Sequence, residues 1–275
     1  MSPDIKEIEN LAIQAGAVLR QRFGQSHQVQ YKSAIDPVTE VDREVEALLL
    51  EHILRRYPDH RIETEESGCF SGKNHHAWFI DPLDGTLNYA HNVPHFTVSI
   101  AYAENGILKL AAIYDPMLDE SFTAVNSEGA RLNGKIIRVS TTESLERCLL
   151  ETDFASDVHT NPDNNLEEYV LFSLHAQSVR QVGSAARALC YVAAGRLDGY
   201  WNNQLSSWDL AAGALIAEEA GAKVTSMYGD PNFFKLPYSV LAANPQIHPQ
   251  MLDLLLQARR KRESGVGLPR PKQAT

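Results

Sequence analysis

The stretch IDPLDGTLNY, residues 80–89, places two aspartates three positions apart directly after the apolar run Ala77–Ile80. A short run of this composition favours a buried strand. An ionised carboxylate at the end of such a strand costs free energy unless a partner compensates its charge, and that partner is often a metal ion. The chain must therefore fold so that suitable partners reach both Asp81 and Asp84. This requirement constrains the chain more than any other feature of its sequence.

The composition is that of an ordinary globular protein. With 275 residues, the chain can form one large domain or two domains that share an interface. Its content of 44% hydrophobic and 22% charged residues excludes the disordered and fibrous classes. The net charge of −10 disfavours nucleic acid as the main partner, so we expect no nucleic-acid partner.

Three features predict a cytoplasmic location. No apolar run approaches the roughly 18 residues that a membrane-spanning helix needs. The first ten residues lack the basic and apolar regions of a signal peptide. The cysteines, Cys69, Cys148 and Cys190, have neither zinc-site nor redox-pair spacing, which suits reduced thiols. We therefore expect a soluble cytoplasmic protein without a membrane partner.

Hydrophobic periodicity predicts two differently built halves. In residues 1–140, the apolar pattern predicts helices over 5–23 and 39–57, and strand-like runs joined by Asn-Gly turns predict a mostly antiparallel sheet. In residues 141–257, helices and strands alternate, which indicates an α/β layered half. Residues 258–275 are basic and polar, which predicts a solvated tail. The elements expected in the second half are strands over 147–153, 197–201, 222–226 and 239–244, and helices over about 165–178, 184–195, 206–221 and 248–260.

Four acidic stretches stand out, and each has a purely structural explanation, which for Glu65 and Glu66 is a solvated loop. Thr39 with Asp42 forms the pattern of a helix capping box. Asp209, near a helix start, would interact favourably with the helix dipole. Asp81 and Asp84 could form successive turns with the Pro and Gly that follow them. The stretches are DPVTEVD (36–42), ETEESG (63–68), IDPLDGT (80–86) and SSWDLAAG (206–213).

Taken together, the four stretches indicate a different chemistry. Their carboxylates are hard oxygen donors without His or Cys, a set that selects Mg²⁺, Mn²⁺ or Ca²⁺. Gly85 and Thr86 can begin a helix whose free backbone N–H groups suit a phosphate. Carboxylates beside an anion site in an acidic protein indicate metal-assisted phosphate chemistry.

Four motifs, in order along the chain, resemble those of the inositol monophosphatase family. WFIDPLDGTLNYAHNVPHFTVSIA is similar to the family's first signature, Trp-x-Ile-Asp-Pro-Ile/Leu-Asp-Gly-Thr-x-Asn-Phe/Tyr, and WDLAAGALIAEEAGA is similar to its C-terminal signature. DPVTEVD and the Glu pair of TEES lie in the expected order before the first signature. VGSAARALCYVAAGRLDGYW matches the segment before the last metal aspartate, and the resemblance covers roughly residues 5–250.

The resemblance implies a layered α+β and α/β fold, the αβαβα sandwich of the inositol monophosphatase and fructose-1,6-bisphosphatase type, assembled as a homodimer. Residues 1–140 would form an N-terminal α+β half that carries most of the metal ligands. Residues 141–257 would form a C-terminal α/β half that carries the last metal aspartate and the substrate contacts. Residues 258–275 would be a flexible basic tail.

The resemblance also implies a site for two or three Mg²⁺ ions, or Mn²⁺ in their place. Asp81 would bridge two of the ions. Glu65 and the backbone carbonyl of Leu83 would complete the first position, and Asp84 and Asp209 would hold the second. Mg²⁺ prefers octahedral oxygen ligands at about 2.0–2.1 Å, so water would fill the positions that the protein leaves open.

By the same resemblance, the catalytic residues would be Asp42, Glu65 and Thr86. Thr86, hydrogen-bonded to Asp42, would orient a metal-activated water and help to remove its proton, with support from Glu65 and Glu66. The N–H groups of Gly85 and Thr86 would bind the phosphate. For Asp42 this catalytic role competes with the capping role given above, and we prefer the catalytic one.

The substrate contacts implied by the resemblance include one departure from the family pattern. Relatives that hydrolyse inositol phosphate have a Glu seven residues before the last metal aspartate, where this chain has Asn202. An amide can still form a hydrogen bond with a sugar hydroxyl, but it carries no charge. Lys32 would either bind phosphate or lie on the surface. The implied substrate-binding residues are Asp84, Gly85, Thr86, Gly183, Ser184, Ala185 and Asn202.

The predicted function is Mg²⁺-dependent, lithium-sensitive hydrolysis of a small phosphorylated substrate, with inositol monophosphate as the first candidate. Fructose 1,6-bisphosphate, histidinol phosphate and 3'-phosphoadenosine 5'-phosphate are alternatives within the same superfamily. In another class, the chain would be a non-catalytic interaction protein that retains the fold, and the basic tail is the feature that supports this alternative.

Overall fold

The computed structural model describes residues 2–25, 29–33, 36–70, 72, 75–154, 157–161 and 163–264, with the side chains of all of these except 29–33 and 36–38. The side chain of Lys32 and the last part of the predicted tail, 265–275, lie outside the described residues. The interpretations given for them above stay predictions.

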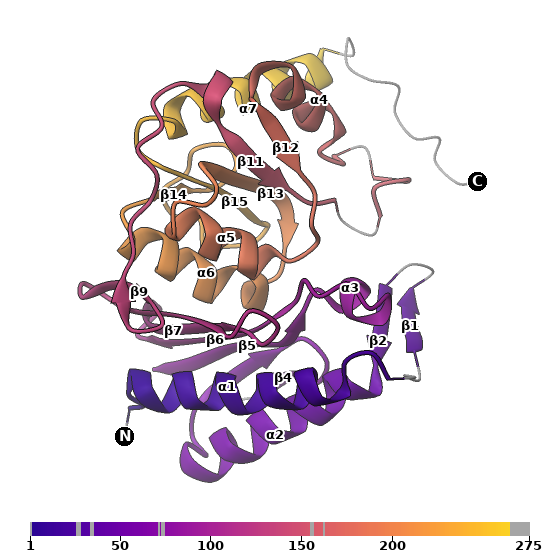
Figure 1. Cartoon of the computed structure of the whole chain (residues 1–275), viewed down its shortest axis with the longest axis vertical. Coiled ribbons are helices and arrows are strands. Elements are labelled where there is room, and N and C mark those ends of the chain that lie inside the picture. Colours follow the sequence, from indigo (N-terminus) through magenta and orange to yellow (C-terminus); the bar gives the residue numbers. More distant parts are fainter. Residues whose placement is uncertain are drawn as a thin grey trace.

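Five layers of secondary structure stack along the long axis of the molecule (Figure 1). Helices α1 and α2 cover the outer face of the first sheet, α5 and α6 lie between the two sheets, and α4 and α7 cover the outer face of the second sheet. The αβαβα sandwich implied by the motifs is thereby confirmed. The helices of these layers are α1 (Ile5–Arg22), α2 (Glu40–Arg56), α4 (Leu166–His175), α5 (Ala185–Ala193), α6 (Ser207–Glu219) and α7 (His248–Glu263).

Within the described residues, eight strands form the first sheet, in the order β10-β9-β8-β7-β6-β5-β3-β4. Neighbouring strands run antiparallel except β3 and β5, which are parallel, so the predicted mostly antiparallel sheet is confirmed. The predicted turns Asn105-Gly106 and Asn133-Gly134 have positive φ angles, as tight hairpins require. The strands are β3 (Arg61–Thr64), β4 (Gly68–Phe70), β5 (His76–Asp84), β6 (Thr97–Glu104), β7 (Ile107–Asp115), β8 (Glu120–Val125), β9 (Gly129–Leu132) and β10 (Lys135–Ile136), and a separate hairpin comprises β1 (Val29–Ser33) and β2 (Asp36–Thr39).

The second sheet contains five strands of the described residues, in the order β12-β11-β13-β15-β14. Strand β11 is parallel to both of its neighbours. The carboxyl ends of β11 and β13 therefore lie side by side, at the same end of the sheet. Its strands are β11 (Leu149–Thr152), β12 (Ser178–Arg180), β13 (Gly199–Leu205), β14 (Lys223–Thr225) and β15 (Tyr238–Ala243), and the connections include the short helices α3 (Thr86–Ala90) and η1 (Leu145–Arg147).

Side-chain caps explain where α1 and α2 begin. The side chain of Asp4 accepts a hydrogen bond from the N–H of Glu7 at 2.9 Å, and Thr39 forms the predicted capping box with Asp42. Both helices then bury an apolar face against the first sheet. The buried apolar residues of the two helices are Ile8, Leu11, Ala12, Ala15, Leu19, Val41, Val45, Leu49 and Ile53.

Small side chains let α5 and α6 pack closely between the sheets. Most residues of both helices are buried, and many of them are alanine. A Cβ atom added at Gly213 would lie 2.6 Å from Cδ1 of Leu189, so this contact between the helices requires glycine. The close packing sets the position of α6, whose first turn carries Asp209.

Two predicted boundaries are wrong. The helix predicted over about 165–178 ends at His175, and Ser178–Arg180 instead forms the edge strand β12 beside β11. A sheet edge offers backbone hydrogen bonds that the local sequence pattern does not reveal. The prediction also places the start of the tail, residue 258, too early. Helix α7 continues to Glu263, and Ala258 is fully buried.

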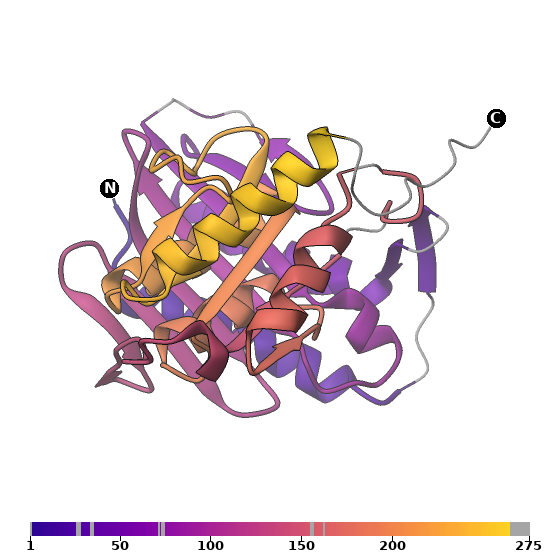
Figure 2. The ribbon, with the colours of Figure 1, turned by 90° about the horizontal axis from the view of Figure 1, so that it is seen from above.

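Helix α4 provides the tertiary contact that orders the end of α7. Figure 2 shows the two helices side by side on the outer face of the second sheet. Arg262 of α7 pairs with Glu168 of α4 at an N–O distance of 2.8 Å. None of the helices in the described part of the chain is long and apolar enough to cross a membrane.

Candidate active site

A pocket of about 300 Å³ lies where segments from both halves of the chain meet. It is formed by the end of β5, by the first turns of α3, α5 and α6, and by β13. All the residues that the motifs imply as metal ligands or substrate contacts line this pocket. They are Glu65, Asp81, Leu83, Asp84, Gly85, Thr86, Gly183, Ser184, Ala185, Asn202 and Asp209.

A β-bulge at the end of β5 lets Asp81 and Asp84 face the same pocket. Side chains three positions apart on a regular strand point to opposite faces of the sheet. Here Asp81 pairs with Ser99 of β6 and Asp84 pairs with Thr97, so β5 contains one extra residue between the two aspartates. The backbone N–H of Leu83 donates to Oδ1 of Asp81 at 2.9 Å, which stabilises this bend.

The pocket concentrates negative charge. The pKa of Asp81 is raised well above its ordinary value, first by burial and then by the charges of Glu65, Asp84 and Asp209. Burial also raises the pKa of Asp84, although hydrogen bonds to its charged form act in the opposite direction. A cation in this pocket would remove the electrostatic cost of ionising both aspartates.

Asp84 connects β5 to the start of α5 in the other half of the chain. Its Oδ2 accepts hydrogen bonds from the hydroxyl of Ser184, from Oγ1 of Thr97 at 3.2 Å and from the N–H of Ala186 at 3.0 Å. Its Oδ1 accepts from the N–H of Ala185 at 3.2 Å. Ser184 and Ala185 therefore direct their donors at this carboxylate.

Gly85 stands at a position where only glycine fits. Its φ of +101° is unfavourable for residues with a Cβ, and a Cβ here would lie 2.8 Å from the carbonyl oxygen of His95. Thr86 follows as the first residue of α3, so the predicted helix start at Gly85-Thr86 is confirmed. The glycine allows the chain to turn sharply from Asp84 into this helix.

Asp42 caps α2 and contacts Thr86 at the same time. Its Oδ2 accepts from the N–H of Thr39 at 2.9 Å and from the Thr39 hydroxyl at 2.6 Å, while its Oδ1 lies 3.1 Å from Oγ1 of Thr86. Burial raises the pKa of Asp42, and the hydrogen bonds from Thr39 and Thr86 lower it. Capping and a role beside the pocket are therefore compatible, because each uses a different carboxylate oxygen.

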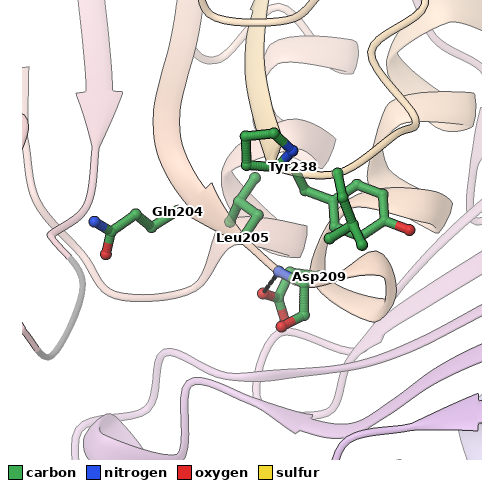
Figure 3. Close-up of a pocket in the computed structure, with 7 residues that line it drawn as sticks. Gln204, Leu205, Asp209 and Tyr238 are labelled. Atoms are coloured by element: carbon green, nitrogen blue, oxygen red, sulfur yellow. Dashed lines mark hydrogen bonds between the residues drawn. The ribbon is translucent and has the colours of Figure 1, made fainter. Parts of the chain in front are cut away.

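Asp209 lies in the first turn of α6 and borders two pockets. Its Oδ2 accepts a hydrogen bond from the N–H of Ser206 at 2.8 Å, which is part of a capping box. Figure 3 shows Asp209 at the second pocket, a space of about 370 Å³ to which Leu205 and Tyr238 also contribute. Because Asp209 lines both pockets, the second adjoins the first.

The donor chemistry of the site fits magnesium. Glu65, Asp81, Asp84 and Asp209 supply carboxylate oxygens, which hard divalent cations prefer. Among the residues that the structure describes, no three His, Cys, Asp or Glu side chains are already placed to hold a metal ion. Repulsion between the carboxylates and the hydrogen bonds held by Asp84 and Asp209 both oppose a closer approach.

Three further residues line the pocket and escape the sequence analysis, namely Leu87, Asp153 and Phe154. A weaker form of the signal at Asp81 is present at Asp153, which ends the strand-like stretch RCLLETD but is separated from its leucines by Glu151 and Thr152. Burial raises the pKa of Asp153 to about 6, so the group is mostly ionised at neutral pH. The pocket thus contains a fifth carboxylate for which the motifs imply no role.

A buried glutamate on β11 makes stability depend on pH. Glu151 is 4% exposed, and burial followed by the charge of Asp153 raises its pKa from 4.5 to about 8. Because the pKa is raised in the folded chain, the stability that Glu151 contributes is present at acid pH and is lost as the pH rises toward 8. Removing this titration should therefore stabilise the folded chain in alkali.

The variant Glu151→Gln tests this expectation. Its free energy of unfolding relative to wild type should rise by about 2–3 kcal/mol between about pH 6 and about pH 9, measured by urea unfolding at each pH. The exposed Glu146→Gln serves as the control and should show no such trend. A difference that is constant with pH would show that Glu151 ionises normally in the folded chain.

The chain is similar to known proteins along most of its length. Residues 1–264 match the model of the inositol monophosphatase family. The chain is 44% identical over 243 residues to the inositol-1-monophosphatase of Synechocystis sp., which covers 88% of this chain and 84% of that protein. It is 43% identical over 231 residues to the Nus factor SuhB of Pseudomonas aeruginosa, which covers 82% and 84%. The crystal structure of the extragenic suppressor protein suhB from Bartonella henselae is 34% identical and aligns with a TM-score of 0.86 over 91% of this chain and 97% of that chain.

Proposed function

This chain belongs to the inositol monophosphatase family, and on that premise we propose that it is a Mg²⁺-dependent phosphatase of small phosphomonoesters. Inositol monophosphate is the first candidate substrate, since the Synechocystis relative is named inositol-1-monophosphatase. The observation that carries the proposal is the convergence of Glu65, Asp81, Asp84 and Asp209 in one pocket beside Gly85-Thr86.

Members of this family are generally metal-dependent. In this chain the carboxylates of Glu65, Asp81, Asp84 and Asp209 and the carbonyl of Leu83 would hold two or three Mg²⁺ ions, or Mn²⁺ in their place. When bound, such ions supply positive charge that stabilises the phosphate in the transition state and lowers the pKa of water. The carboxylates that repel one another would then share an attractive partner.

Thr86 and Asp42 would activate the attacking water. The hydroxyl of Thr86 lies 3.1 Å from Oδ1 of Asp42 and 3.0 Å from the carbonyl oxygen of Leu83, so it can donate its hydrogen to one of them. Its lone pairs then accept a hydrogen bond from the water. As the water attacks phosphorus, its proton would pass to Oγ1 of Thr86 while the hydroxyl proton of Thr86 passes to Oδ1 of Asp42, whose pKa is raised by burial, and Glu65 would help to hold the water.

Backbone and side-chain groups of both halves would bind the substrate. The N–H groups of Gly85 and Thr86 would donate to the phosphate, and the leaving group would lie against Asp84, Gly183 and Asn202. The donors of Ser184 and Ala185 are directed at Asp84. These two residues would therefore act by positioning that carboxylate, not by direct contact with the leaving group.

Three further expectations extend the proposal, two from the family resemblance and one, the location, from the composition of the sequence. We expect a homodimer, a cytoplasmic location and inhibition by Li⁺. Turnover that is unchanged in millimolar Li⁺ would contradict the last of these, and a monomer in sedimentation equilibrium would contradict the first.

The SuhB relatives favour a second candidate, a non-catalytic interaction protein. The Pseudomonas relative is named a Nus factor, a name that states no hydrolytic activity. An interaction protein would have no need of four carboxylates gathered in a pocket, so the pocket favours the enzyme. Fructose 1,6-bisphosphate, histidinol phosphate and 3'-phosphoadenosine 5'-phosphate remain alternative substrates of the enzyme.

Phosphate release from a substrate panel tests the proposal. The panel contains inositol 1-phosphate and the three alternatives just named, each measured with Mg²⁺ and with EDTA. We expect release that requires Mg²⁺, fastest with inositol 1-phosphate. Removal of residues 265–275, which leaves α7 intact, should not change kcat. No release from any of the four substrates would contradict the enzyme and favour the interaction protein.

A further inference from the structure

Among the residues that the structure describes, the lining of the pocket is strongly acidic. The part of the lining that the structure describes contains no Lys, Arg or His. Glu65, Asp81, Asp84 and Asp209 would face the cations, whereas Asp153 remains as a fifth carboxylate with its own position at the edge of the second sheet. A second phosphate near Asp153 would meet a negative charge where it needs a positive partner.

The parallel pairing of β11 and β13 places Asp153 beside Asn202. Thr152 pairs with Trp201, and the next residue of each segment is Asp153 and Asn202. Both of these residues line the pocket. The carboxyl ends of β11 and β13 therefore present a carboxylate and an amide next to each other.

Hydrogen bonds from the backbone of Val182 and Gly183 and from a tyrosine hydroxyl hold the carboxylate of Asp153 in place. The N–H of Gly183 donates to Oδ1 at 2.8 Å, and the hydroxyl of Tyr200 donates to Oδ2 at 3.3 Å. A carboxylate has about four lone-pair positions, so these bonds still leave acceptor capacity on a half-buried group that lines the pocket.

Both polar atoms of the Asn202 amide, in contrast, form hydrogen bonds within the protein. Its Nδ2 donates to the hydroxyl of Tyr200 at 3.0 Å, and its Oδ1 accepts from the N–H of Gln204 at 3.0 Å. The residue is 4% exposed. Asn202 thereby orients the Tyr200 hydroxyl toward Asp153, and Asp153 is the stronger acceptor that remains for a ligand.

We propose that Asp153 is a specificity-determining residue that accepts hydrogen bonds from the hydroxyl groups of an uncharged, polyhydroxylated leaving group. The inference rests on the proposed phosphatase function and names a residue that recognises the leaving group of its substrate. A site built to hydrogen-bond hydroxyl groups discriminates strongly against analogues that lack them. The negative charge of Asp153 also repels substrates that carry a second phosphate. The enzyme should therefore prefer a polyol monophosphate to the alternatives that carry two phosphates.

The test compares wild type with Asp153→Asn on three substrates in the presence of Mg²⁺. They are inositol 1-phosphate, phenyl phosphate, whose leaving group has no further hydroxyl, and fructose 1,6-bisphosphate. The substitution keeps the size of the side chain and an acceptor for the N–H of Gly183. We expect KM for inositol 1-phosphate to rise roughly tenfold or more while kcat changes less than about threefold. Phenyl phosphate should be unaffected, and kcat/KM for the bisphosphate should rise.

The control is Asp157→Asn, which makes the same change in charge at an exposed residue outside the pocket lining and should affect none of the substrates. Equal changes for all three substrates in Asp153→Asn would overturn the proposal, because a merely structural role would affect them together. Unchanged kinetics would overturn it as well. If wild type releases phosphate from none of the three, the proposed function fails and this inference fails with it, an outcome distinct from an active enzyme that ignores the substitution.

Discussion

Replacing Asp81 by Asn is expected to lower Mg²⁺-dependent kcat by roughly 10³-fold or more. Asp81 is 2% exposed, and after burial the charges of Glu65, Asp84 and Asp209 all raise its pKa. It therefore lies at the electrostatic centre of the site. An amide of the same shape cannot neutralise cations, so the variant should lose both the ions and the activity. The measurement is phosphate release from inositol 1-phosphate across a range of Mg²⁺ concentrations.

Stability measurements separate this loss from misfolding. The raised pKa of Asp81 means that its ionisation destabilises the metal-free folded chain as the pH rises. Without Mg²⁺ the Asp81→Asn variant should thus unfold at the same temperature as wild type or higher. Mg²⁺ should raise the Tm of wild type and leave that of the variant nearly unchanged. The exposed Asp253→Asn should behave as wild type throughout. A variant that keeps its Mg²⁺ response and its turnover would refute the placement of Asp81 at the metal site.

The second large effect is expected in the middle layer, where Gly213→Ala should destabilise the protein by about 2–3 kcal/mol. Glycine to alanine within a helix ordinarily stabilises by about 0.5–1 kcal/mol, so the expected sign is reversed. The reason is the contact with α5, because the new Cβ would lie 2.6 Å from Cδ1 and 2.7 Å from Cβ of Leu189. Thermal unfolding should show a Tm lower by roughly 4–10 °C.

A double variant distinguishes this clash from other causes. Leu189→Ala alone leaves a cavity and should cost about 2–5 kcal/mol. In Leu189→Ala/Gly213→Ala the new methyl group enters that cavity, so the combined cost should be smaller than the sum by about 1–2 kcal/mol. Additive costs would show that the two positions do not compete for space. Because Asp209 precedes Gly213 by one helical turn, the single glycine variant should also bind Mg²⁺ more weakly.

Much of the site can be predicted because its signals are local. Asp81, Asp84, Gly85 and Thr86 lie within six consecutive residues, and the cost of a buried charge draws attention to them without any knowledge of the fold. The helix that begins at Thr86 and the capping box at Thr39 depend on side chains at most three positions away. Signals that span only a few residues can be recognised in a single sequence.

Other features have no local signal. The edge strand Ser178–Arg180 exists because β11 offers it a partner, and the last turns of α7 are helical because α4 covers them. The two roles of Asp42 cannot be separated in the sequence, since Thr86 is 44 positions away. Asp153 acquires its place beside Asn202 only through the pairing of β11 with β13.

By itself, the sequence determined which residues could carry the chemistry, which segments are helices and strands, and the family to which the chain belongs. The family motifs already implied that four carboxylates share a site. Only the tertiary structure decided which oxygen of Asp42 faces Thr86, and that a fifth carboxylate, Asp153, lines the same pocket beside Asn202. The reason is one of range. Hydrophobic periodicity, capping and turn chemistry act over a few residues, whereas convergence depends on how both sheets pack against α5 and α6, and that packing is a property of the whole core.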